Sequence, residues 1–311
     1  MFKILTLIYL FISLCFNHVS YANETYKIIV KVNNKIISNH DIEKEKNYLS
    51  ALNPQILDIE EDEFKKIAKQ SLIREVIKEE EVSIYYKVDY QSPNLIKLAE
   101  NLYTRLNINS EEEFEEYLKE YDLILKDVLK KISIEANWNN LIYEKFKDRI
   151  NIDRDKIKKR LELENSLIKK EKLFLLSEIV FTAKNNEEYD DVYRKILNTI
   201  EEKDFKSAAT IYSLSETAKF GGEIGWVSKN DISEKIYKKI SNLKINEFIE
   251  PIKIATGFLL INLDNKKEKE KENNVEKIFN KVVSTEMNRQ LNQYSTVYYK
   301  KLEKKSFVDE N

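Results

Sequence analysis

The sequence predicts an α+β protein in which helices predominate. Apolar residues recur at helical spacing from residue 64 to residue 146. β-branched and aromatic residues instead form short extended runs, among them 26–32 and 173–181. Because glycine enters φ > 0 conformations freely, its concentration in one stretch predicts a tight turn that feeds a strand. The four glycines of the chain are Gly221, Gly222, Gly225 and Gly257.

The composition is that of a folded, charged protein that does not bind nucleic acid. The 52 basic residues are balanced by 54 acidic ones, whereas a phosphate-binding face usually unbalances the charge. The 18 Tyr and 14 Phe supply core material in a chain of 311 residues. We find no glycine-rich phosphate loop, so ATP and other cofactors are not expected.

Residues 1–22 have the pattern of a secretory signal. Lys3 precedes the apolar run 4–16, and Ser20-Tyr-Ala22 provides a small-x-small cleavage site. The apolar run is short for a membrane span, so we expect cleavage after Ala22, with an uncleaved anchor as the alternative. The sole cysteine, Cys15, leaves with the signal. A mature chain without thiols fits a bacterial periplasm, and it holds no thiolate metal site.

The first elements after the signal are a hairpin and a capped helix. Residues 26–32 and 36–37 are predicted strands around a turn. Ser38 and Asp41 form a capping box that opens the first helix. His40 lies in its first turn and is expected to be a surface residue, because no second His or Cys remains to complete a metal site.

Four apolar stripes follow and are expected to be core rather than groove. Pro93 restarts the chain before the second, and Ser110 caps the third. The stripes run over residues 64–84, 95–102, 114–121 and 125–146.

The second half alternates strands and helices. Strand 173–181 is followed by predicted helices at 186–200, 205–212 and 231–237, the last capped by Asp231. We expect Pro251 to lie in a strand at a sheet edge or bulge. The mixed-charge run 266–274 is interpreted as a solvated linker. The helix predicted over 275–302 is too apolar on one side to stand alone and should dock elsewhere.

Three of these segments together resemble the parvulin family of peptidyl-prolyl isomerases. They are Phe220-Gly-Gly-Glu-Ile-Gly-Trp-Val227, Ile249-Glu-Pro-Ile252 and Thr256-Gly-Phe-Leu-Leu-Ile261, with an apolar helix after the first. The resemblance implies an antiparallel four-stranded sheet surrounded by helices, over residues 172–266.

The remainder of the chain resembles SurA-type periplasmic chaperones. The resemblance covers most of residues 26–160, through Val32-Asn-Asn-Lys-Ile-Ile-Ser-Asn-His-Asp-Ile42 and the helices that follow it. It implies an N-terminal helical domain over 23–171 and a segment 267–311 that returns to dock on it. The tail 306–309 resembles the short strand that ends this segment. The helical domain would then be built from both chain ends, with the parvulin-like domain inserted.

The parvulin resemblance also assigns positions to a catalytic site. The two family histidines fall at Glu178 and Leu259, so both imidazoles are missing. The Cys/Asp position falls at Ser215 and the Ser/Thr position at Thr256, which makes these the catalytic candidates. A buried carboxylate at Glu178 would need a partner or a raised pKa.

An apolar groove remains as a candidate peptide site. The family's Met/Leu and Phe positions fall at Ile232 and Ile236, and Trp226 and Phe258 are further candidates for the groove. The alternative for Trp226 is an anchor in the domain core, which we favour.

These features predict a periplasmic chaperone that binds unfolded or extended polypeptides, in particular outer-membrane proteins. The alternatives are an active, if weakened, peptidyl-prolyl isomerase and an adaptor that uses its C-terminal helix for one dedicated partner. No metal, no nucleic acid and no stable membrane span after signal cleavage are expected.

Overall fold

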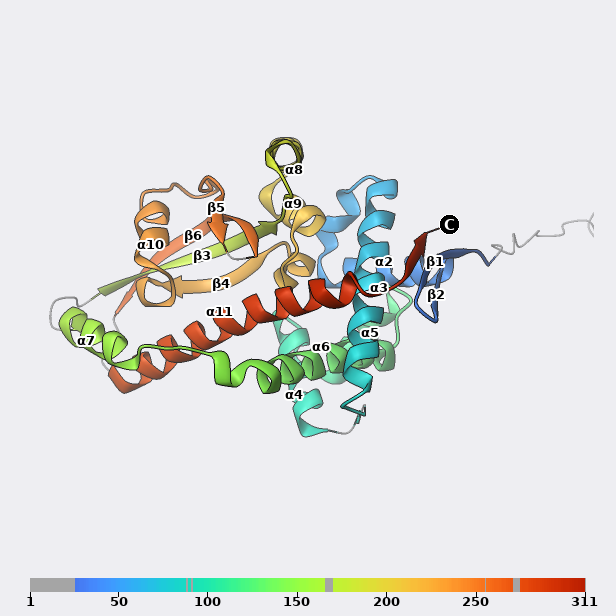
Figure 1. Cartoon of the computed structure of the whole chain (residues 1–311), viewed down its shortest axis with the longest axis horizontal. Coiled ribbons are helices and arrows are strands. Elements are labelled where there is room, and N and C mark those ends of the chain that lie inside the picture. The colour runs from blue at the N-terminus through green and yellow to red at the C-terminus, as the bar shows by residue number, and fades with distance from the viewer. Residues whose placement is uncertain are drawn as a thin grey trace, which may run out of the picture.

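The fold combines a helical body with a separate four-stranded sheet (Figure 1). The computed structural model describes residues 26–87, 89–90, 92–165, 170–254, 256–270 and 275–310. The predicted signal lies outside these residues. No helix within the described ranges combines the length and the apolar character that a membrane crossing needs.

A three-stranded sheet joins the two ends of the chain. Strands β1 (Ile28–Val32) and β2 (Lys35–Ser38) form the predicted hairpin. Strand β7 (Val308–Glu310) pairs antiparallel with β1 on its other side. The backbone N–H of Asn33 donates to the carbonyl of Phe307 at 2.8 Å. The C-terminal tail therefore completes a sheet that the first residues begin.

The helical body follows the predicted stripes. The Ser38–Asp41 capping box opens the first helix as expected. Its core contains buried Phe64 and Ala68 from one helix and Phe114 from another. The helices of the body are α2 (Asn39–Leu52), α3 (Glu61–Ser83), α4 (Pro93–Arg105), α5 (Glu111–Lys119), α6 (Leu125–Phe146) and α7 (Arg154–Asn165).

The long C-terminal helix α11 (Val275–Glu303) runs beside α6 and belongs to this body (Figure 1). The indole of Trp138 on α6 is 1% exposed and donates to Ser295 Oγ on α11 at 2.8 Å. The rings of Phe146 and Tyr294 stack with centroids 4.7 Å apart. Apolar residues from both halves of the chain thus share one core cluster.

The second sheet is antiparallel, with strand order β4-β3-β6-β5. Helices α8 (Asn186–Glu202) and α9 (Phe205–Tyr212) cover the face that carries Ile179 and Phe181. Helix α10 (Glu234–Ile240) covers the other face, which carries Phe174 and Leu176. This confirms the predicted fold class. The strands are β3 (Lys170–Phe181), β4 (Glu223–Ser228), β5 (Ile252–Ile254) and β6 (Gly257–Glu270).

Three sequence predictions are corrected here. Residues 266–270 are not a linker but the end of β6, where they pair with the start of β3 and Lys269 forms an ion pair with Glu171 at 3.1 Å. Helix α10 begins later than predicted and is capped by Ser233, because Asp231 instead closes a capping box with Ser228. Residues 271–274 of the predicted linker lie outside the described residues.

Trp226 is the third correction, because it is not a core anchor. Its side chain is 37% exposed on β4, an edge strand. The ammonium of Lys267 lies 4.0 Å from the ring centroid, which is a cation–π geometry. The sequence gives no signal for this, since a Trp after a glycine turn is equally compatible with a core position.

Two of the glycines are required by close backbone approach. A Cβ on Gly222, which has φ +77°, would lie 2.3 Å from the carbonyl oxygen of Glu178. A Cβ on Gly257, with φ +141°, would lie 2.2 Å from the carbonyl oxygen of Phe181. Both glycines therefore let a turn pack closely against β3, and the Gly222 turn holds the segment that precedes β4 beside Glu178.

Candidate functional site

A carboxylate and two hydroxyls meet where β3 passes the segment that precedes β4. Ser215 Oγ donates to Glu178 Oε1 at 2.6 Å, and Thr217 Oγ1 lies 3.1 Å from the same oxygen. The two hydroxyls are themselves 3.0 Å apart. Two of the positions predicted from the sequence, Glu178 and Ser215, are thus brought together, and Thr217 was missed.

The backbone fixes this cluster. Leu214 N–H donates to the carbonyl of Val180 at 2.7 Å, and Val180 N–H donates to Ser213 Oγ at 3.0 Å. Further along, Glu178 N–H donates to the carbonyl of Gly222 at 2.8 Å. The segment from 213 to 222, including the 3₁₀ helix η3 (Glu216–Phe220), is therefore laid along β3 as if it extended the sheet.

Burial raises the pKa of the Glu178 carboxyl, and the hydrogen bonds from Ser215 and Thr217 oppose this effect. One carboxylate oxygen already accepts both hydroxyls. Neither hydroxyl proton is then directed at a ligand. The cluster is a satisfied polar group, in contrast to an imidazole, which could donate and accept at once.

The predicted apolar groove is only partly assembled. Ile236 on α10, Ile232 just before it and Leu259 on β6 are half-buried and pack together between α10 and the sheet. Leu259 pairs with Val180, two residues beyond Glu178 on β3, and alternate residues of a strand share a face. Leu259 therefore lies on the same face as Glu178, as the sequence-based assignment of both positions to one site requires.

The other predicted groove residues lie elsewhere. Phe258 stacks on Phe181 with ring centroids 5.3 Å apart, on the face under α8 and α9. Trp226 on β4 pairs with Leu175 on β3, and it is not part of the apolar cluster that contains Ile232 and Ile236. Thr256 lies in the turn between β5 and β6, and within the described residues its hydroxyl makes no bond to Glu178 or Ser215. The expectation that Phe258 and Trp226 line one groove with Ile232 and Ile236 is therefore wrong. Phe258 packs on the sheet face opposite to α10, and Trp226 is exposed on an edge strand.

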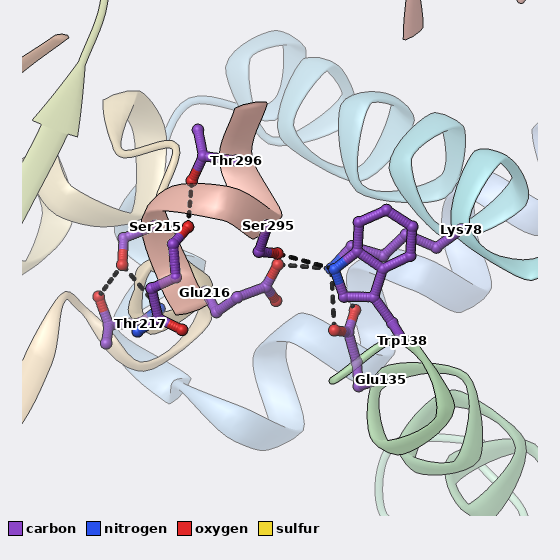
Figure 2. A network of polar contacts seen from close by, with 9 residues as sticks. Lys78, Glu135, Trp138, Ser215, Glu216, Thr217, Ser295 and Thr296 are labelled. Carbon is purple, nitrogen blue, oxygen red and sulfur yellow. Dashed lines mark hydrogen bonds and ion pairs between the residues drawn. The ribbon is translucent and has the colours of Figure 1, made fainter. Parts of the chain in front are cut away.

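Directly after Ser215, the chain makes an ion pair with the helical body. Glu216 Oε1 accepts from Lys78 Nζ at 2.5 Å, and Lys78 also lies 2.8 Å from Glu135 Oε2 (Figure 2). The Lys78 side chain is 2% exposed and its ammonium lies 5.5 Å from the Trp138 ring centroid. This is a buried cation held by two carboxylates from different parts of the fold.

Electrostatics keep Glu216 ionised. Burial acts to raise its pKa, but the charges of Lys78, Lys219 and Arg74 prevail and lower the pKa to about 2. Sequence reasoning missed this pair because Lys78 begins the run Lys-Glu-Glu-Glu81, a pattern typical of a solvated helix face.

A second ion-pair network lies beside the first. Lys131 Nζ contacts Glu45 Oε2 at 2.6 Å and also pairs with Glu75. Ser71 Oγ donates to the other oxygen of Glu45 at 2.6 Å. Glu45 is 2% exposed, so its charge depends on these partners.

A cavity of about 600 Å³ lies between the helical body and the η3 segment. Helices α2, α3 and α6 form one wall, and α9 with η3 forms the other. Ser215 and Glu216 both line it. The catalytic candidate therefore faces the boundary between the two parts of the fold.

A four-stranded antiparallel sheet with helices on both faces, carried by a helical body from both chain ends, has the arrangement that the sequence predicts for a parvulin-type domain inserted into a helical one. Residues 167–265 match the family described as rotamase, PPIC-type PPIase domain. The chain therefore contains a match to this domain family, and parts of it are similar to SurA chaperones, the family that the sequence resembles.

Curated relatives include Chaperone SurA of Pseudomonas putida, 24% identical over 163 residues, which are 50% of this chain and 38% of the relative. Chaperone SurA of Cupriavidus metallidurans is 34% identical over 67 residues, or 22% of this chain and 14% of the relative. The chain thus aligns with less than two fifths of the length of these relatives.

Solved structures that match the chain include PrsA of Bacillus subtilis, 18% identical with a TM-score of 0.29, covering 90% of this chain and 92% of that one. One of the two SurA-like chaperones of Campylobacter jejuni, PEB4 and Cj1289, is 15% identical with a TM-score of 0.33, covering 91% and 98%.

Proposed function

We propose that this protein is a chaperone that holds unfolded or extended polypeptides, and that its PPIC-type domain binds peptide with weak or lost isomerase activity. The proposal that isomerase activity is weak or lost rests on the hydrogen bonds of Glu178. At the position of a family histidine, its carboxylate accepts both Ser215 and Thr217. The sequence contains no histidine after His40 that could replace the missing imidazoles.

The chemistry of the prolyl bond explains why this cluster would be a poor isomerase site. Isomerisation crosses a barrier of about 18–20 kcal/mol set by amide resonance. An enzyme lowers it by binding the twisted amide better than the planar one. Hydroxyl protons already committed to Glu178 contribute little to that difference. Peptide binding, which needs only an apolar surface, is compatible with the half-buried Ile232, Ile236 and Leu259.

The cellular setting is part of the proposal. The predicted signal 1–22 would deliver the chain to the periplasm, where unfolded outer-membrane proteins are the fitting clients. We further propose that the functional division follows residues 23–171, 172–266 and 267–311. The core shared by α6 and α11 and the pairing of β7 with β1 support a body made from the first and third segments.

The chaperone proposal is tested by the aggregation of a denatured outer-membrane barrel protein, followed by light scattering. We expect suppression at stoichiometric amounts of the mature chain. Scattering equal to that with an inert protein would remove the proposal. Recovery of one stoichiometric partner from periplasmic extract, in place of many unfolded clients, would favour the adaptor alternative.

The isomerase alternative is favoured by the Ser215 hydroxyl, which lies beside β3 where the family carries Cys or Asp. A refolding reaction limited by proline isomerisation decides it. If the alternative holds, the mature chain accelerates refolding, and Ser215→Ala or Ile232→Ala reduces the acceleration. Refolding at the buffer rate would reject it and leave the peptide-binding role in place.

A further inference from the structure

The cavity between the helical body and the η3 segment has two kinds of lining. Its walls include the apolar side chains of Leu49, Ile67, Ile211 and Phe220. Charged side chains lie among them, from α2, α3 and α6 on one side and from η3 on the other. A volume of about 600 Å³ is within the range of sites that bind small ligands or a few residues of peptide.

Four carboxylates of this lining already pair with cations. Glu45 and Glu75 pair with Lys131, and Glu135 pairs with Lys78. Glu216 completes this arrangement through the same lysine. Two lysines thus hold four carboxylates, and none of the four is directed at a ligand.

Two cations of the lining, Arg74 and Lys219, are placed differently. Within the described residues neither has a carboxylate oxygen within 4 Å. Arg74 on α3 lies 6.0 Å from the ring centroid of Tyr299, and Lys219 on η3 lies 5.6 Å from that of Phe220. Both contribute to the low pKa of Glu216 without pairing with it.

Lys219 remains charged in this setting. Burial lowers its pKa, but the phenol of Tyr48 and the carboxylates of Glu135 and Glu216 prevail, so its pKa is raised. A guanidinium from the body and an ammonium from the sheet domain therefore face one cavity with hydrogen-bond donors to spare.

We propose that this cavity is a composite binding site for a short extended peptide segment that carries a carboxylate next to an apolar or aromatic side chain. Arg74 and Lys219 bind the carboxylate, and the apolar wall receives the neighbouring side chain. Charge-assisted hydrogen bonds of this type are the stronger ones in proteins. This inference rests on the proposed peptide-binding function. It adds a preference for a carboxylate beside an apolar side chain, which the apolar sheet face under α10 would not provide.

The test is fluorescence anisotropy with the mature full-length chain and three labelled probes. The first is Ala-Ala-Phe with a free C-terminal carboxylate, the second is its C-terminal amide, and the third is the amide of Ala-Phe-Glu. We expect the first or the third to bind about tenfold more tightly than the second. Whichever binds shows whether the carboxylate comes from a chain end or from a side chain.

Substitutions of Arg74 and Lys219 test whether these two residues bind the carboxylate of the probe. Arg74→Gln and Lys219→Gln should each weaken the carboxylate probe by about five- to tenfold and leave the amide probe unchanged. Lys195→Gln, which removes an exposed lysine of α8, is the matched control. Because neither test residue holds an ion pair within the described chain, both variants should fold, which circular dichroism checks.

Equal binding of the carboxylate and amide probes would overturn the inference, as would Arg74→Gln and Lys219→Gln variants that bind like the unmodified chain. Displacement of the peptide by millimolar acetate or phosphate alone would also overturn it, because the cavity would then be a general anion site. Aggregation suppression that persists in any of these cases would leave the chaperone proposal intact.

Discussion

Lys78 Nζ lies 2.5 Å from Glu216 Oε1 and thereby joins helix α3 of the helical body to the η3 segment of the sheet domain. The neighbouring residue Ser215 donates to Glu178 on β3. Two consecutive residues thus contact the candidate site and the body. A change in the Glu216–Lys78 contact should therefore alter the Ser215–Glu178 contact, and the reverse, because Ser215 and Glu216 are adjacent in the chain.

Glu216→Gln should destabilise the protein at neutral pH by about 1–2 kcal/mol. A hydrogen bond to a charged group contributes about 1.5–3 kcal/mol, and the 52% exposure of the Glu216 side chain reduces this through solvent screening. Lys78 retains Glu135, so its charge is not left alone. Urea denaturation of the variant and of Glu201→Gln, an exposed control, measures the difference.

The Lys78–Glu216 pair also predicts how the stability of the folded protein depends on pH. The folded-state pKa of Glu216 is lowered to about 2, so its contribution is present above the unfolded pKa and is lost as the pH falls toward 2. The stability difference between the unmodified chain and Glu216→Gln should therefore shrink between about pH 4.5 and pH 2. A difference that is constant over this window would contradict the pairing.

Glu178→Gln should stabilise the protein at neutral pH. Burial raises the pKa of Glu178 in the folded state above its value in the unfolded state, so ionising the carboxyl destabilises the folded protein. This destabilisation is absent below the unfolded-state pKa. It grows as the pH rises from the unfolded-state pKa through the folded-state pKa. Each unit of pKa difference corresponds to about 1.4 kcal/mol. The variant and the unmodified chain should be equally stable near pH 4 and diverge above it, as thermal unfolding across this range would show. A variant that is less stable at pH 8 would mean that Glu178 is held as a favourable carboxylate.

The sequence predicts most of the fold because local signals agree with the tertiary structure. The glycine turn, the hairpin and the capping box each require particular residue types, and Gly222 and Ser38 are where the structure needs them. The long helix 275–302 is predicted to dock, since its apolar side needs a partner.

The candidate site is less predictable, because it depends on which charges become buried. Lys78 and Glu216 each lie in polar runs that are typical of solvent, and only the tertiary structure buries Lys78 and pairs it with Glu216. Phe258 packs in the cluster under α8 and α9, whereas Ile236 on α10 packs on the other face of the sheet, and the sequence resemblance alone does not reveal this separation.

Gly222→Ala should be strongly destabilising, by at least about 2–3 kcal/mol, because φ +77° disfavours alanine and the new Cβ would meet the carbonyl of Glu178. Gly225→Ala is the matched control. Its φ of +88° carries a conformational cost of about 1–2 kcal/mol, but no atom lies within 4 Å of the added Cβ. Chemical denaturation of both variants separates steric contact from backbone strain. Equal losses would mean that the close approach to β3 is relaxed at little cost.

Ser295→Ala tests whether the two ends of the chain form one core. The substitution removes the acceptor of the buried Trp138 indole, and an unsatisfied buried donor costs about 1–3 kcal/mol. The better helix propensity of alanine offsets about 0.5 kcal/mol of this loss. Thr296→Ala, next along the same helix, makes a similar propensity gain while removing only a bond to the carbonyl of Asn292, and should be near neutral. Urea denaturation followed by tryptophan fluorescence compares the two. If Ser295→Ala were as stable as Thr296→Ala, helix α11 would not be held against α6 through Trp138, and a body built from both chain ends would lose its main polar contact at this point.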